Sequence, residues 1–286
     1  MANPSVQERL KTVSGLILQR EDLREPLKLQ KEILQIQHEI DRTPTKGTSV
    51  NWNDRTIIEG LLQKSLETKK PIVHFLDPTV FKLDILSQLS TRIAKVLCER
   101  TAGKKGLENF SRLMESGELD LLKLVEATLK ADIVFIKKTA EKLELPHEIL
   151  LYMLSVLVQP SLEEIARKID SSLLDNWWQP HCPVCGRIPV IARLRDRKRY
   201  LVCTFCGAEY LSDSFLCVHC GNRDPYMLKY LVIQEQPAFQ IDFCTKCKHY
   251  IKVIDETKLK ENIPRGLEDI ITLGVDFVAK KANLER

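Results

Sequence analysis

The chain has 286 residues, with 43 Lys and Arg against 39 Asp and Glu, and 44% of its residues are hydrophobic. This composition is typical of a folded globular protein and excludes a disordered or fibrous chain. The longest nearly unbroken apolar stretch, 149–158, would make a helix of about 15 Å, half of a bilayer core, so we expect a buried helix. The first ten residues lack a basic segment followed by an apolar one. The sequence therefore predicts neither a membrane span nor secretion.

The first 175 residues have the periodicity of helices. Apolar residues recur at steps of three and four, for example at Val6, Leu10, Val13 and Ile17, which places them on one helix face. Strand-like alternation is nearly absent, and we find no metal, nucleophile or phosphate motif. The sequence therefore predicts an all-α domain of seven to nine helices over residues 1–175, which recognises a client protein and performs no chemistry.

Local signals predict where some of these helices begin and end. Pro160-Ser161 followed by Glu164 has the spacing of a capping box and predicts a helix start. Proline, glycine and polar residues predict breaks at 43–53 and 69–78. We expect these breaks to divide the domain into separate packed helices.

Cysteine and charge are concentrated in the C-terminal part. Residues 181–286 carry 17 positive and 13 negative side chains, whereas the first 180 residues hold 26 of each. Eight of the nine cysteines form four CxxC pairs: Cys182/Cys185, Cys203/Cys206, Cys217/Cys220 and Cys244/Cys247. One such pair is a weak signal, but four indicate metal binding, because two tight turns can close a tetrahedron of sulfurs. Glycine follows three pairs directly, at 186, 207 and 221, and it adopts the positive φ that such a turn needs.

The spacing of the pairs favours two sequential sites. Seventeen residues separate Cys185 from Cys203 and 23 separate Cys220 from Cys244, and both inserts have strand-like ends, as expected for zinc ribbons with hairpins. The simplest arrangement places Cys182, Cys185, Cys203 and Cys206 in a first ribbon over 176–213. Cys217, Cys220, Cys244 and Cys247 would form a second ribbon over 214–286, which ends in a closing helix. An arrangement that interleaves the first pair with the third is left open.

The donor set limits the chemistry of these sites. Disulfides suit secreted chains, and redox-active thiol pairs are usually found at helix N-termini, so both explanations fit less well than metal. With eight thiolates present, we expect His181, His219 and His249 not to be ligands. Four cysteines leave no position for substrate or water, so the sequence predicts a structural or one-electron site and no enzyme. Such a site suits Fe and Zn alike, and the choice between them stays open.

The tip of the first hairpin, residues 193–199, carries five positive charges and one negative. It could be a solvated tip, contact the phosphates of nucleic acid, or dock on an acidic protein surface. Nucleic acid is favoured less, because Tyr200 is the one aromatic residue beside the tip and stacking surfaces are needed for single strands. We expect a partner protein to contact the five basic residues: Arg193, Arg195, Arg197, Lys198 and Arg199.

Five segments follow one another over residues 177–281 as an ordered set of motifs. They are DNWWQPHCPVCGRIPV, RYLVCTFCGAEY, LCVHCG, FCTKCKHYIKVID and LEDIITLGVDFVAKK. Together they resemble the FdhE family of formate dehydrogenase accessory proteins. The resemblance implies a multidomain α+β fold, with an all-α N-terminal domain, two tandem rubredoxin-like four-cysteine modules and a closing helix. It also implies that the eight cysteines bind two metal ions.

Four further residues match the family motifs, namely Tyr200, Glu209, Tyr250 and Lys252. Two departures accompany them. Glu268-Asp269 stands where the family has paired aspartates, and Ala282-Asn283 stands where it has a closing Gly-Tyr. The second departure puts any role of the extreme C-terminus in question.

The resemblance implies a cytoplasmic factor for the maturation of formate dehydrogenase. Such a factor would bind the catalytic subunit, would also meet other maturation factors, and would turn over no small molecule. Iron is the metal associated with the rubredoxin-like sites of the family. The residues themselves leave two alternatives open: a zinc-ribbon protein that binds nucleic acid, and a rubredoxin-like electron-transfer protein.

Overall fold

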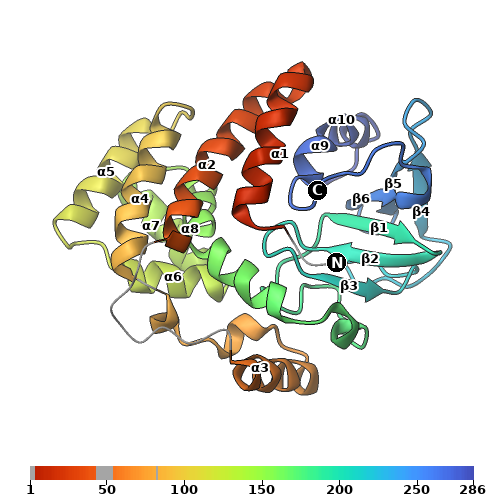
Figure 1. The fold of residues 1–286 in the computed structure, drawn as a ribbon, viewed down its shortest axis with the longest axis horizontal. Coiled ribbons are helices and arrows are strands. Elements are labelled where there is room, and N and C mark those ends of the chain that lie inside the picture. Colours follow the sequence, from red (N-terminus) through yellow and green to blue (C-terminus); the bar gives the residue numbers. More distant parts are fainter. Residues whose placement is uncertain (1–3, 43–53, 82) are drawn as a thin grey trace.

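The computed structural model describes residues 4–42, 54–81 and 83–286, and the predicted break at 43–53 lies outside them (Figure 1). The described part contains eight α-helices before residue 175, within the predicted number. These are α1 (Val6–Gln19), α2 (Arg24–Arg42), α3 (Arg55–Thr68), α4 (Leu83–Cys98), α5 (Lys104–Glu115), α6 (Leu121–Leu129), α7 (Ile133–Leu143) and α8 (His147–Lys168). The predicted break at 69–78 is confirmed, because α3 ends at Thr68 and short 3-10 turns follow.

Helix α8 is the central helix of the helical layer. Among the described residues, it alone has the length and composition to cross a membrane, but 61% of its most apolar window is buried inside the protein. This burial confirms the core helix expected at 149–158. Pro160 lies inside α8, so the helix start predicted at Ser161 is wrong. Buried apolar residues on both sides of Pro160 outweigh the single backbone hydrogen bond that proline removes.

The C-terminal part is a six-stranded sheet with the order β3-β2-β1-β6-β5-β4. Its strands are β1 (Ile191–Arg195), β2 (Lys198–Val202), β3 (Glu209–Ser212), β4 (Leu228–Val232), β5 (Phe239–Cys244) and β6 (Tyr250–Asp255). Both predicted hairpins are present, as β1–β2 and β4–β5. The two modules are not separate sheets, because β1 and β6 pair in parallel and join them. The boundaries predicted at 175/176 and 213/214 remain predictions about folding units.

The closing helix is divided into α9 (Glu268–Ile271) and α10 (Leu273–Lys281). Val275 and Ala279 of α10 pack on Ile241 and Tyr250 of the sheet. Leu267, at the start of α9, packs on the opposite side with Val6, Val13 and Leu27 of α1 and α2, and Figure 1 shows α1 between α2 and these last helices. The closing helix therefore contacts both the sheet and the helical layer.

Two connections hold the α1–α2 hairpin and the first cysteine loop in place. Arg9 of α1 makes a two-pronged ion pair with Glu163 of α8, with nitrogen–oxygen distances of 2.9 and 2.5 Å, and both side chains are buried. In the 3-10 turn after α3, the amide of Ile72 donates to Pro183 O at 2.8 Å and that of Val73 donates to Val184 O at 2.9 Å. The cysteine loop is thus bonded directly to the helical part.

Candidate metal centres

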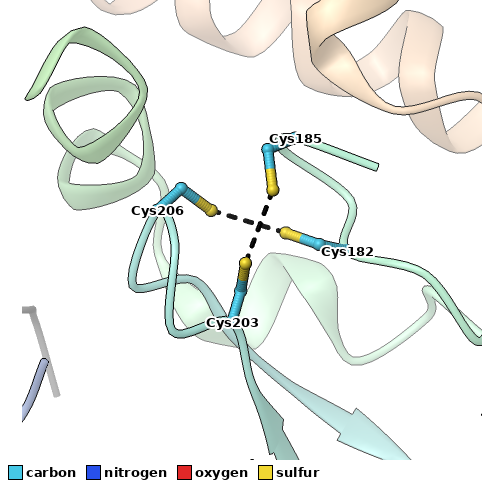
Figure 2. A group of neighbouring side chains, drawn as sticks. All are labelled: Cys182, Cys185, Cys203 and Cys206. Atoms are coloured by element: carbon cyan, nitrogen blue, oxygen red, sulfur yellow. Dashed lines mark hydrogen bonds between the residues drawn. The ribbon is translucent and has the colours of Figure 1, made fainter. Parts of the chain in front are cut away.

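The first cysteine group combines two loops of the sheet. Cys182 and Cys185 precede β1, and Cys203 and Cys206 lie between β2 and β3. The four sulfurs point toward one centre (Figure 2) and lie within 4.8 Å of one another, with 3.5 Å between Cys182 and Cys206 and 3.4 Å between Cys185 and Cys203. All four side chains belong to the main hydrophobic core, and none is more than 9% exposed.

The second group has the same construction but is more open. Its sulfurs also lie within 4.8 Å of one another, with 3.7 Å between Cys217 and Cys247 and 3.8 Å between Cys220 and Cys244. Cys220 is exposed and Cys247 is half-buried. Asn222 Nδ2 donates to Cys244 Sγ at 3.7 Å. The structure therefore brings together the two sequential sets of cysteines and not the interleaved ones, and neither group includes a histidine.

Both groups fit a tetrahedral metal ion. A metal–sulfur distance of about 2.3 Å implies sulfur–sulfur distances of about 3.8 Å, close to those observed. All nine cysteines are free thiols, so no disulfide competes for the sulfurs. Each group could hold one ion, and its four-sulfur donor set suits Fe and Zn.

Backbone hydrogen bonds close the cysteine loops into tight turns. The amide of Gly186 donates to Cys182 O at 2.9 Å, and that of Gly207 donates to Cys203 O at 2.8 Å. Gly186, Gly207 and Gly221 have φ angles of 75°, 74° and 70°, so the predicted positive φ is confirmed. In the fourth pair Lys248 occupies this position with a φ of 64°, which shows that the turn can form without glycine at some strain.

Burial makes the metal-free first group costly to ionise. Burial raises the pKa of the Cys182 and Cys206 thiols well above the ordinary value, whereas hydrogen bonds from the other thiols, first from Cys182, lower that of Cys203. Four thiolates therefore cannot coexist in this core without a cation. A divalent ion would replace the protons, so metal binding would release protons and stabilise the fold.

Three residues that match the family motifs attach the sheet to its neighbours. Lys252 is 1% exposed and pairs with Asp269 at 2.6 Å and Asp276 at 2.8 Å. Tyr250 Oη donates to Asp276 at 2.6 Å. Glu209 accepts hydrogen bonds from Arg195 and Arg265. The resemblance identified these residues, but sequence reasoning missed Asp276, because no spacing links a helix residue to a strand partner 24 positions away.

Two of the five predicted tip residues are inside the protein. Arg193 is 1% exposed and pairs with Glu256 at 2.9 Å and Glu268 at 2.8 Å. Arg199 is 3% exposed and donates to the Leu216 carbonyl at 3.0 Å. The two side chains lie on opposite faces of the β1–β2 hairpin, because Arg193 is opposite Tyr200 and Arg199 is opposite Leu194. Internal acceptors bind terminal guanidinium nitrogens of both side chains. Neither is accessible to a partner in this conformation.

The other three tip residues differ in accessibility. Arg195 is half-buried and pairs with Glu256 at 2.8 Å and Glu209 at 3.2 Å. Arg197 and Lys198 are exposed at the turn between β1 and β2. The expected cluster of five accessible charges is thereby reduced to these two, because other segments cover both faces of the hairpin, with Glu256 and Glu268 on one face and Leu216 and Asp242 on the other.

Comparisons with known proteins extend the sequence resemblance. No family model matches the chain. It is 32% identical over 139 residues to an FdhE homologue of Aquifex aeolicus, which covers 47% of this chain and 48% of that protein. It is 30% identical over 131 residues to one of Stutzerimonas stutzeri, covering 43% of this chain and 38% of the relative. The chain thus spans about half or less of the length of these relatives.

A solved structure covers nearly the whole chain. The crystal structure of the FdhE protein from Pseudomonas aeruginosa superposes with a TM-score of 0.62, covers 99% of this chain and 95% of that one, and is 17% identical. This likeness shows a shared fold from the first helices to the closing helix. With the sequence matches, it confirms that this chain resembles the FdhE family.

Proposed function

We propose that this protein is an accessory factor for the assembly or maturation of formate dehydrogenase, and that it acts by binding the catalytic subunit. The observation that carries the proposal is the pair of four-sulfur groups on one continuous sheet, in a chain similar to FdhE homologues. Cysteines fill all four positions of each site, so neither site offers a position for a substrate. The protein therefore works as a binding platform without turnover, and we assign it to the cytoplasm on the resemblance.

The two ions would act mainly on the rigidity of this platform. Each ion would join the CxxC loop that precedes a hairpin to the CxxC loop that follows it. The first ion would also fix the contact between its first loop and the helical part. We propose that Cys182, Cys185, Cys203 and Cys206 hold one ion and that Cys217, Cys220, Cys244 and Cys247 hold the other. Elemental analysis of protein purified without oxygen gives the metal and its stoichiometry. A rubredoxin-like visible spectrum identifies iron, and a colourless protein with two zinc ions excludes a redox role.

An exposed apolar surface near the second cysteine group supports a binding role. β4 is an edge strand of the sheet, and large apolar side chains are exposed on it and beside it: Phe215, Tyr226, Met227, Tyr230 and Val232. Exposed apolar patches and unpaired strand edges are features that soluble proteins usually keep for partners. We propose that the catalytic subunit contacts this surface, and that Arg197 and Lys198 and the helical domain add further contacts.

Capture of the client tests this proposal. Tagged wild-type protein should retain the catalytic subunit of formate dehydrogenase from a cell extract, identified with an antibody to that subunit. Tyr230→Glu should lower the captured amount at least tenfold, because it places a charge on the apolar surface. Phe277→Glu is the matched control, since Phe277 is an aromatic residue on α10, outside the proposed contacts, and is about as exposed as Tyr230. No capture by the wild type, or equal loss in both variants, rejects the proposal.

The accessible charge gives little support to nucleic acid as the partner. With Arg193 and Arg199 buried, the hairpin tip offers two free cations, whereas phosphate contacts by several cations are needed for tight binding. We expect no salt-dependent binding of DNA or RNA.

A further inference from the structure

A cavity of about 620 Å³ lies between the helical part and the loop of the first cysteine group. Its walls come from the turn between α6 and α7, from α8, from residues 69–74 and from the loop that carries Cys185. The volume is within the range of small-molecule sites, which is about 300–1,000 Å³. No residue of the proposed client surface lines it.

The charges that line this cavity all have one sign. Its charged side chains are those of Lys69, Lys70, Lys130 and Arg187, and the imidazoles of His74 and His181 also line it. Within the described part of the chain, no Asp or Glu lines the cavity. The whole chain is nearly balanced, with 43 basic against 39 acidic residues, so this concentration of positive charge is a local feature.

Most of these cations have no carboxylate partner. Lys130 pairs with Glu126 at 2.5 Å. No ion pair to Lys69, Lys70 or Arg187 is present among the residues that the structure describes. Like charges gathered without counter-charges repel one another, and an anion placed between them would relieve that repulsion.

Two contacts hold Arg187 in a fixed position in the wall of the cavity. Its guanidinium lies 3.4 Å from the centre of the Phe205 ring, and Nη2 donates to Ser155 Oγ at 2.5 Å. A planar, oriented guanidinium is suited to bind a phosphate with two hydrogen bonds.

The remaining wall is apolar. Leu129, Leu151, Val158 and Leu162 line it, together with the ring of Phe205. A bare inorganic anion would leave this surface uncovered. We infer that the cavity is a binding site for a small molecule that carries a phosphate or diphosphate group and an apolar or aromatic part.

The cysteine group offers a competing explanation for the positive charge. Cys185 also lines the cavity, and four thiolates with one divalent ion have a formal charge of −2, which Arg187 would partly offset. If the lysines serve only to offset the charge of the cysteine group, replacing them should lower metal retention. In that case the wild-type protein should bind neither anionic probe. Metal content and ligand affinity therefore separate the two explanations.

The test uses the full, metal-loaded protein and two probes, inorganic pyrophosphate and adenosine diphosphate, measured by calorimetry at low salt. Both probes should bind, and the nucleotide should bind more tightly because its base covers the apolar wall. Lys69→Gln/Lys70→Gln should weaken both at least tenfold with unchanged metal content. Lys137→Gln/Lys138→Gln, an exposed pair on α7, removes the same charge and should change neither affinity.

Three results would overturn the inference. They are the absence of binding by both probes, equal weakening in the two double variants, and tighter binding of a polyglutamate peptide than of either probe, which would assign the cavity to a protein partner. The experiment contains no formate dehydrogenase. Its outcome is therefore independent of the proposed function.

Discussion

The hydrogen bonds between residues 72–73 and the first cysteine loop provide a local readout of the metal at that site. The amides of Ile72 and Val73 donate to the carbonyls of Pro183 and Val184, which lie between the two cysteines of the first pair. We predict that Cys185→Ser, which removes one of the four ligands, releases these two amides. Hydrogen exchange at Ile72 and Val73 measures their release directly.

The expected size of the effect follows from the burial of the site. All four cysteines of the first group are core residues, so loss of the ion leaves buried thiols and an unsupported loop. A structural zinc ion contributes about 10–16 kcal/mol in small peptides, against a total stability of about 5–15 kcal/mol for a domain. Even a fifth of that contribution, about 2–3 kcal/mol, would speed exchange at Ile72 and Val73 about 100-fold, since each 1.4 kcal/mol is about tenfold.

The matched control is Cys247→Ser in the second group. Cys247 is half-buried and its group is partly open to solvent, and it lies outside the main core cluster. This variant should lose one ion per chain and keep slow exchange at Ile72 and Val73. If Cys185→Ser kept both ions, or lost one without faster exchange at these amides, the first group would not be the metal site that anchors the helical part.

Two further predictions concern buried charges. Glu163→Gln leaves the Arg9 guanidinium buried without its carboxylate and should lower the free energy of unfolding, measured by chemical denaturation, by about 3–5 kcal/mol. The double variant Arg9→Met/Glu163→Leu should recover most of this loss. A loss below about 1 kcal/mol in the single variant would contradict a buried ion pair. Burial raises the pKa of Glu256, but hydrogen bonds from Arg195 and Arg193 outweigh it and lower this pKa from 4.5 to about 2. The unfolded carboxyl is therefore protonated first, so the stability from Glu256 is present above pH 4.5 and is lost as the pH falls toward 2. In Glu256→Gln, the denaturation midpoint should change less with pH in that window than it does in the wild type. An unchanged pH dependence would count against the ion pairs of Glu256.

The cysteine loops and hairpins could be predicted because their determinants are local. A CxxC pair and the glycine after it act within five residues, and the strand-like ends of 187–202 are close in the chain. The same locality explains the helices, whose apolar periodicity needs no partner to be recognised. Pro160 shows the limit of local signals, since its start signal is real but is overridden by the buried face of α8.

The amino-acid sequence alone was enough to define the helical N-terminal part and the eight cysteines, and its spacing favoured their division into two sequential groups, which the structure then selected over the interleaved arrangement. Contacts between distant segments decided the rest: the parallel pairing of β1 with β6 that merges two ribbons into one sheet, the burial of Arg193 and Arg199, and the cationic cavity. Apart from the contacts of Arg199 with Leu216 and Asp242, these features depend on residues more than 50 positions apart, such as Arg193 with Glu256 and Ile72 with Pro183. Periodicity and spacing carry no information about which face of one element meets another, because packing of the whole chain selects those contacts.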